Sequence, residues 1–379
     1  MNINKKLIYK TLLAIIGVII LAVGGFMAYL MIPSGFQSRQ AEGPKVLTEL
    51  LKMAEESQPF NPDPYISSTY RPGDPLYEPV LAIQRDRWDI AQKLLQPLVE
   101  QGNADAMYWL AQITYDDSYY SSGPAAKLFQ KSAELGNPYA ALRLDSKNLE
   151  CQMFMSGYCD QKWGELGRKL LQERAAQGDK KAEYYLLQYD ENSSEEVHKE
   201  LERLVTENAK NHYYQPLMRL IYDYYDGRYL SFFNRGTPPN EEQKKILVTI
   251  SKIPANNNFT PAINKVLYTD RDLLDKAYIS RVIDKCLTLN SQQYSCMEYL
   301  SNSNDRNKII EGAAYAYATD ITKNKTEKEN ELGLFEFMLD KHNIKSLTDE
   351  EVEKAHKIAK LILKNMTPVI YIDEMNTRP

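Results

Sequence analysis

A pattern of small and polar residues recurs three times between positions 91 and 188 of this 379-residue chain. Each copy runs through a leucine-containing stretch to a glycine, an asparagine or aspartate, and then an alanine. The copies read AQKLLQPLVEQGNADAMYWL, AKLFQKSAELGNPYAALRL and GRKLLQERAAQGDKKAEYYL. Their glycines, Gly102, Gly136 and Gly178, are 34 and 42 residues apart. A period of this size is typical of solenoids built from helix pairs.

The repeated positions fit the junction between two helices. In the first copy, Gly102 can end a helix in a left-handed conformation, and Asn103 can cap the free amides of the next helix. Ala106 allows two helices to approach closely, and Leu110 falls on the same buried face. The equivalent residues are Gly136, Asn137, Ala140 and Leu144 in the second copy, and Gly178, Asp179, Ala182 and Leu186 in the third. Because one pair cannot bury its own apolar stripe, the pairs must stack.

These residues resemble the Sel-1-like repeat, a short relative of the tetratricopeptide repeat. The resemblance covers residues 91–188, about a quarter of the chain. It implies an all-α fold, an α-solenoid of stacked helix pairs that binds other proteins on its concave side without catalysis. Helix pairs with weaker resemblance are expected at 200–228, 246–268 and 282–300, where the glycines are lost.

The first forty residues predict a membrane anchor. Residues 11–38 contain no charged side chain. This stretch is long enough for one transmembrane helix. Lys5, Lys6 and Lys10 precede this stretch, so the positive-inside rule places the N-terminus in the cytoplasm. The alternative is a cleaved signal peptide, but no A-x-A-like cleavage site follows. We therefore expect a single-pass protein of the bacterial inner membrane with its body in the periplasm.

The chain divides into four predicted parts. Residues 1–38 form the cytoplasmic stub and transmembrane helix, and residues 39–80 a short helix and a proline-rich spacer. Residues 81–230 hold the Sel-1-like repeats, and residues 231–379 a degenerate helical-repeat region. The proline-rich stretch cannot continue a helix and is either a spacer or a strap laid along the domain. A capping box of Thr348 and Glu351 starts the last helix, and we expect an unstructured tail after Pro368.

The four cysteines form two close pairs, Cys151 with Cys159 and Cys286 with Cys296. Their spacings do not fit the C-x-x-C clamp of a structural zinc site. In an oxidising compartment two local disulfides are the natural interpretation, and free buried thiols are the alternative.

Charge and motifs argue against nucleic-acid binding and catalysis. The net charge is −5, so without the three N-terminal lysines the body carries −8 and is a poor partner for phosphate backbones. Nucleophile elbows, phosphate loops, dinucleotide fingerprints and H-E-x-x-H motifs do not occur in the sequence. Two E-x-x-H steps, Glu195 with His198 and Glu353 with His356, lie in highly charged segments and indicate solvated helix faces. We therefore expect no enzyme, no cofactor and no metal.

One column of the repeat varies while the scaffold positions do not. Trp109, Arg143 and Tyr185 each lie three residues after the repeat alanine. Aromatic residues and arginine are enriched at protein interfaces, so these three are the predicted partner-binding residues.

The sequence therefore predicts a membrane-anchored periplasmic helical-repeat protein that binds another protein. Some exported proteins with Sel-1-like repeats resemble immunity proteins. By this resemblance, we favour neutralisation of a secreted envelope-targeting toxin, such as a type VI secretion lipase effector. A scaffold or regulator of an envelope protein complex is the alternative, and an enzyme with an unrecognised site is a third.

Overall fold

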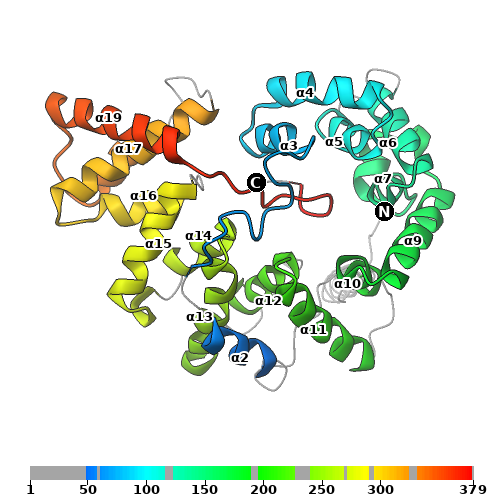
Figure 1. Ribbon diagram of the computed structural model, residues 1–379, viewed down its shortest axis with the longest axis horizontal. Helices are drawn as coiled ribbons and strands as arrows, with labels where there is room; N and C mark the ends of the chain where they lie inside the picture. Colours follow the sequence, from blue (N-terminus) through cyan, green and yellow to red (C-terminus); the bar gives the residue numbers. More distant parts are fainter. Residues whose placement is uncertain are drawn as a thin grey trace, which may run out of the picture.

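The computed structural model describes residues 48–57, 60–115, 123–188, 195–226, 240–268, 271–289, 294–323 and 331–377. The regular structure of these residues is helical, apart from one isolated bridge between Asp373 and Asn376. The helices follow one another around a ring (Figure 1). The prediction of an all-α solenoid is therefore confirmed.

The three repeat copies form helix pairs at the predicted positions. Gly102, Gly136 and Gly178 adopt φ angles of 85°, 95° and 92°, the left-handed conformation that ends the first helix of each pair. Each following Asn or Asp side chain accepts a hydrogen bond from the amide of the repeat alanine, as Asn103 does from Ala106 at 2.9 Å. The pairs are α4 (Trp88–Glu100) with α5 (Ala104–Gln112), α6 (Pro124–Glu134) with α7 (Pro138–Arg143), and α9 (Gln161–Ala176) with α10 (Lys180–Gln188).

An insertion separates the second pair from the third. Helix α8 (Leu149–Phe154) and the 3-10 helix η2 (Ser156–Tyr158) lie there, and the disulfide between Cys151 and Cys159 joins them. The second disulfide joins Cys286 of α15 (Lys276–Leu289) to Cys296 of α16 (Tyr294–Ser301). Both predicted cysteine pairings are thus present in the structure.

Beyond the repeats, two described turns of the solenoid use residues other than glycine. His212 and Asn258 take left-handed φ angles of 60° and 61° where the glycines stood earlier. The capping box of Thr348 and Glu351 starts the last helix, as predicted. The remaining ring helices are α3 (Tyr77–Gln84), α11 (Glu195–Lys210), α12 (Gln215–Asp226), α13 (Glu241–Asn256), α14 (Thr260–Tyr268), α17 (Arg306–Lys323), α18 (Glu331–Lys341) and α19 (Asp349–Asn365), with the 3-10 helix η3 (Arg271–Leu273).

The two ends of the arc approach each other. Lys323, the last residue of α17, lies 3.7 Å from the carboxylate of Asp86 in the turn between α3 and α4. This ion pair joins the first and last parts of the solenoid, and Figure 1 shows the resulting ring.

The predicted transmembrane segment, residues 11–38, lies outside the described residues. Helix α2 (Thr48–Glu56) packs against α13 at the edge of the ring. Among the helices that the structure describes, none is long and apolar enough to cross a membrane.

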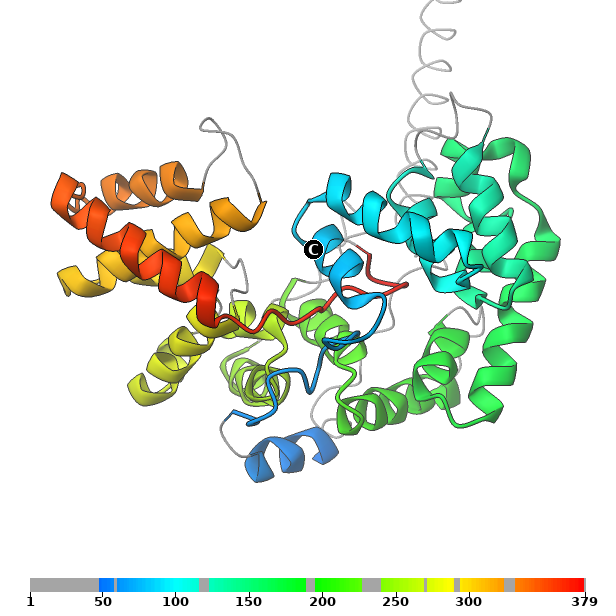
Figure 2. The ribbon, with the colours of Figure 1, turned by 45° about the horizontal axis from the view of Figure 1, so that its top comes forward.

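The proline-rich stretch was interpreted as either a spacer or a strap, and the contacts of residues 60–76, here called the strap, decide between the two. The amide of Asn61 donates to the carbonyl of Asn256 at 2.6 Å, and Asn258 donates its side-chain amide to the carbonyls of Asn61 and Asp63. The chain then crosses the centre of the ring toward α3 (Figure 2). It is a strap laid along the domain.

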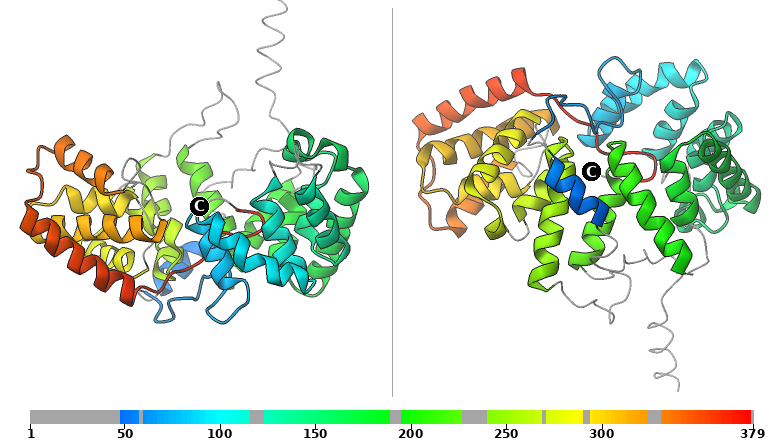
Figure 3. Two further views of the ribbon diagram at one scale, coloured as in Figure 1. Left: turned by 90° about the horizontal axis from the view of Figure 1, so that it is seen from above. Right: turned by 60° about the horizontal axis from the view of Figure 1, so that its bottom comes forward.

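Residues 366–377, here called the C-terminal segment, are ordered, so the expectation of an unstructured tail after Pro368 was wrong. The segment leaves α19, runs extended through the centre of the ring between the two arms of the solenoid, and turns back at residues 373–376 (Figures 1 and 3). Val369, Ile370 and Ile372 are all buried there. Burial of these branched side chains supplies the free energy that orders the segment.

Candidate binding site on the inner face of the ring

Side chains of the ring and the strap hold the main chain of the C-terminal segment. Gln84 bonds it from both ends of its amide: Nε2 donates to the carbonyl of Val369 at 2.9 Å, and Oε1 accepts from the amide of Tyr371 at 2.8 Å. Four further bonds are Tyr77 Oη to the carbonyl of Pro368, Thr69 N to that of Ile370, Thr69 Oγ1 to that of Ile372, and Gln215 Nε2 to that of Tyr371. The inner face therefore binds an extended polypeptide largely through its backbone.

A half-buried lysine binds the acidic end of this segment. Lys181 Nζ lies 2.8 Å from Glu374 Oε2 and 3.3 Å from Asp373 Oδ2. The same ammonium lies 4.9 Å and 5.1 Å from the ring centroids of Tyr139 and Tyr213, which favours its charge. Asp373 is 1% exposed and Lys181 is 19% exposed, so the pair is largely withdrawn from solvent.

The carboxylates keep Lys181 charged in this environment. Burial alone would lower the pKa of Lys181, but Asp373 and Glu374 raise it well above its usual value. Burial would likewise raise the pKa of Asp373, while Lys181 and the hydroxyl of Tyr213 hold it below its usual value. The pair is therefore ionised across the neutral range.

Two tyrosine hydroxyls and Asn376 form a chain of hydrogen bonds that ends at Asp373. Tyr213 Oη donates to Asp373 Oδ2 at 2.5 Å, and Tyr185 Oη lies 2.8 Å from Tyr213 Oη. Because Tyr213 donates its only proton to Asp373, Tyr185 donates its hydroxyl hydrogen to Tyr213 and accepts from the side-chain amide of Asn376 at 3.0 Å. Burial and then the charge of Asp373 raise the pKa values of Tyr185 and Tyr213, which keeps both hydroxyls protonated as donors.

The structure places the three predicted partner-binding residues in two different surroundings. Trp109 is 0% exposed, and its indole donates to Tyr70 Oη at 3.1 Å. Tyr185 is 6% exposed beneath the C-terminal segment. Arg143 lies at the edge of a neighbouring groove, where it bonds Gln112 and pairs with Glu150. Their role in binding a partner stays a prediction.

Sequence reasoning missed Lys181, Tyr213, Asp373 and Glu374. A signal for Lys181 was present, because it lies four residues before Tyr185 and so shares its helix face. The two acids carried no such signal, because they lie outside the repeats.

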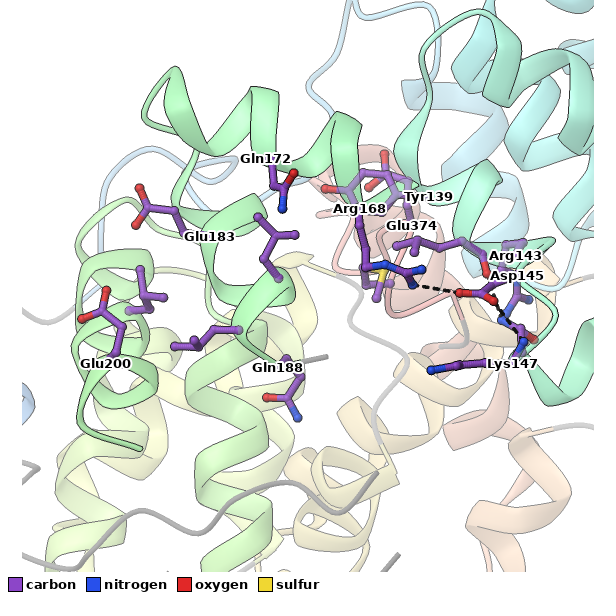
Figure 4. Close-up of a pocket in the computed structure, with 16 residues that line it drawn as sticks. Tyr139, Arg143, Asp145, Lys147, Arg168, Gln172, Glu183, Gln188, Glu200 and Glu374 are labelled. Carbon is purple, nitrogen blue, oxygen red and sulfur yellow. Dashed lines mark hydrogen bonds and ion pairs between the residues drawn. The ribbon is translucent and has the colours of Figure 1, made fainter. Parts of the chain in front are cut away.

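The groove beside this cluster lies between α7, α9, α10 and α11 and has a volume of about 1150 Å³. In Figure 4, Arg143, Asp145, Lys147 and Arg168 lie toward one end, and Glu183 and Glu200 toward the other. We call this the inner groove. Its apolar lining comprises Leu142, Leu186, Leu187, Leu204 and Met375.

The C-terminal segment forms one wall of the inner groove through Glu374 and Met375. Leu186, predicted to be a buried scaffold residue, is only half-buried and lines the groove instead. The groove exceeds the usual volume of small-molecule pockets, about 300 to 1000 Å³. Its size and its apolar side chains between a mixed-charge end and an acidic end suit a segment of polypeptide.

The stacked helix pairs define the class of protein, an α-solenoid with a filled centre. Comparison with family models and with curated proteins found no match for the chain. A solved structure of a protective antigen present in uropathogenic Escherichia coli strains, described as displaying an SLR (Sel1-like repeat) fold, is similar at 17% identity and a TM-score of 0.37. The similarity covers 76% of this chain and 60% of that chain, so this chain spans less than two thirds of its length.

Proposed function

We propose that this chain is a protein-binding α-solenoid that holds a segment of a partner protein in the inner groove. The observation that carries the proposal is the groove itself, in which apolar side chains lie between a mixed-charge end with Arg143, Asp145, Lys147 and Arg168 and an acidic end with Glu183 and Glu200, on the inner face of a repeat scaffold. Such a surface provides both the apolar area and the charge pattern by which one partner is distinguished from another.

The neighbouring C-terminal segment supports a polypeptide as the occupant. The inner face already holds an extended stretch of chain, because the side chains of Gln84, Thr69 and Gln215 donate hydrogen bonds to its main-chain carbonyls. Main-chain contacts of this kind supply affinity in peptide-binding proteins, while side-chain pockets supply specificity.

For the partner, we propose a toxin that acts in the bacterial envelope, such as a type VI secretion lipase effector, with this chain as its membrane-anchored immunity protein. The uncharged stretch 11–38 preceded by three lysines favours export of the body to the periplasm. Disulfides at Cys151–Cys159 and Cys286–Cys296 suit an oxidising compartment. The body's charge of −8 would speed the capture of a basic toxin.

The groove is tested with a pair of alanine variants. Leu186→Ala with Leu187→Ala should weaken binding of the product of an adjacent toxin gene by about tenfold or more, because central apolar contacts dominate interfaces. Leu361→Ala on α19, where the side chain is 58% exposed and lies outside the groove, is the control and should leave affinity unchanged. Equal affinity of both variants and the wild type would remove the groove from the binding surface.

The immunity role is tested in cells. Cells that lack the gene should die when attacked by toxin-bearing siblings, and cells that carry it should survive. If both survive equally, the immunity proposal is wrong and the role as scaffold or regulator of an envelope complex takes its place.

A further inference from the structure

We infer that the inner face of the ring around Lys181 is a binding site for an extended acidic peptide, and that the C-terminal segment occupies it as an internal ligand which an acidic segment of the partner replaces. This inference rests on the proposed function and deepens it, because it names the kind of partner segment.

The C-terminal segment is held as a peptide ligand is held. It is extended up to Ile372 and then closes in a turn at residues 373–376 that presents Asp373 and Glu374 to Lys181. Side chains of α3, α12 and the strap bond its carbonyls and the amide of Tyr371. Backbone contacts of this type do not depend on the sequence that occupies the site. Ile370 and Ile372 add an apolar requirement at alternate positions.

Lys181 sets the charge of the occupant. Within the described residues, both carboxylates that pair with Lys181, those of Asp373 and Glu374, belong to the C-terminal segment. A largely buried ammonium left without a counter-ion is strongly unfavourable. A segment that replaces the C-terminal one must therefore bring its own carboxylate to Lys181, and Tyr213 offers a hydrogen bond to that carboxylate.

The site is continuous with the inner groove. Glu374 lies against Lys181 and also lines the groove, and Met375 lines it next in sequence. Departure of the C-terminal segment would therefore remove one wall of the groove and join it to the space that the segment occupies beside the strap. A single partner segment could then fill the groove and place an acid at Lys181.

The first test uses the full chain with its own ligand weakened. In a variant carrying Asp373→Asn and Glu374→Gln, a fluorescent peptide of residues 367–379 should bind saturably by anisotropy. The wild-type chain should bind it about tenfold or more weakly, because its own segment competes. A peptide carrying the same two substitutions should also bind about tenfold or more weakly, because it brings no charge to Lys181.

The second test substitutes no residue of the chain and adds only a protease site. A protease site inserted after Met366 of the full chain is cut, and the labelled peptide is added to the cut protein. The peptide should exchange into the ring while circular dichroism shows that the helices persist. Absence of exchange, or unfolding in both tests, would overturn the inference, because the segment would then be a fixed part of the core.

Two further outcomes separate this inference from its alternatives. Loss of peptide binding with toxin binding intact overturns the acidic-ligand inference and leaves the groove proposal standing. If the Leu186 and Leu187 variant loses toxin binding but still binds the peptide, both the groove proposal and the acidic-ligand inference are supported. The toxin and the peptide then use two adjoining surfaces. Concentration-dependent dimers that have exchanged their C-terminal segments would overturn the inference in favour of a second copy of the chain.

Discussion

Lys181 and Glu374 form an ion pair of 2.8 Å although 193 positions separate them in the sequence. Asp373 lies 3.3 Å from the same ammonium. One side chain of helix α10 thus fixes the end of a segment that follows the last helix, and it does so inside the ring.

Lys181→Met should therefore destabilise the protein and loosen the C-terminal segment. The change leaves Asp373 and Glu374 without their cation, and breaking a buried pair in this way costs about 3 to 5 kcal/mol. Urea unfolding should report the loss, and amides of residues 367–377 should exchange faster with deuterium. The control is Lys169→Met on α9, because Lys169 is 72% exposed in its pair with Glu173 and should contribute less than about 1 kcal/mol. Similar losses in both variants would contradict the role assigned to Lys181.

Acid should weaken the same cluster. Since the pKa of Asp373 is lowered in the folded protein, its contribution to stability is present above its ordinary pKa, about 3.9, and is lost as the pH falls through the lower folded value. At the alkaline end the raised pKa of Lys181 preserves the pair up to about pH 10. The free energy of unfolding should fall more steeply below about pH 4 in the wild type than in Asp373→Asn. Parallel pH profiles would show that Asp373 is not the responsible group.

The repeat glycines should resist substitution for conformational reasons alone. A Cβ added at Gly102 or Gly178 would meet no atom within 4 Å, yet the φ angles are 85° and 92°. Alanine at either position should cost about 1 to 2 kcal/mol in thermal or urea unfolding. Gly157 is equally open but lies outside the left-handed region, so Gly157→Ala is the matched control and should change stability by less than about 0.5 kcal/mol.

Both disulfides should be found in the isolated protein. Non-reducing peptide mapping should recover Cys151 linked to Cys159 and Cys286 linked to Cys296, and reduction should lower stability by about 2 to 3 kcal/mol for each short loop. Quantitative alkylation of all four thiols without a reductant would refute the pairing.

The proposed orientation, with the N-terminus in the cytoplasm and the body exported, rests on the lysines that precede residues 11–38. Alkaline phosphatase fused after Pro79 should be active in the export compartment. Inactive phosphatase together with activity of a cytoplasmic reporter at the same position would show the opposite orientation.

The helix junctions were predictable because their signals are local. Gly102, Asn103 and Ala106 act within a few residues of one another, and the structure gives each the expected role. Later junctions use His212 and Asn258 in the left-handed conformation, which a search for glycine does not detect.

The candidate site was predictable only in part. Trp109 and Tyr185 were predicted to bind a partner, and that role stays a prediction. Both are buried, Trp109 against Tyr70 of the strap and Tyr185 against Asn376 of the C-terminal segment. Tyr185 and Asn376 are 191 positions apart. Periodicity within a repeat carries no information about a contact of that range.

The wide separation of these contacts also sets an order of assembly during folding. Each helix pair closes over a few dozen residues, whereas the strap meets the C-terminal segment across 301 to 304 positions. Contacts between nearby residues form early, and distant ones must wait for the chain between them to be organised. The arc therefore assembles pair by pair and its centre is filled last. A molecule arrested before that step displays an open apolar channel with an uncompensated lysine, which is the species that a chaperone or a protease would encounter first.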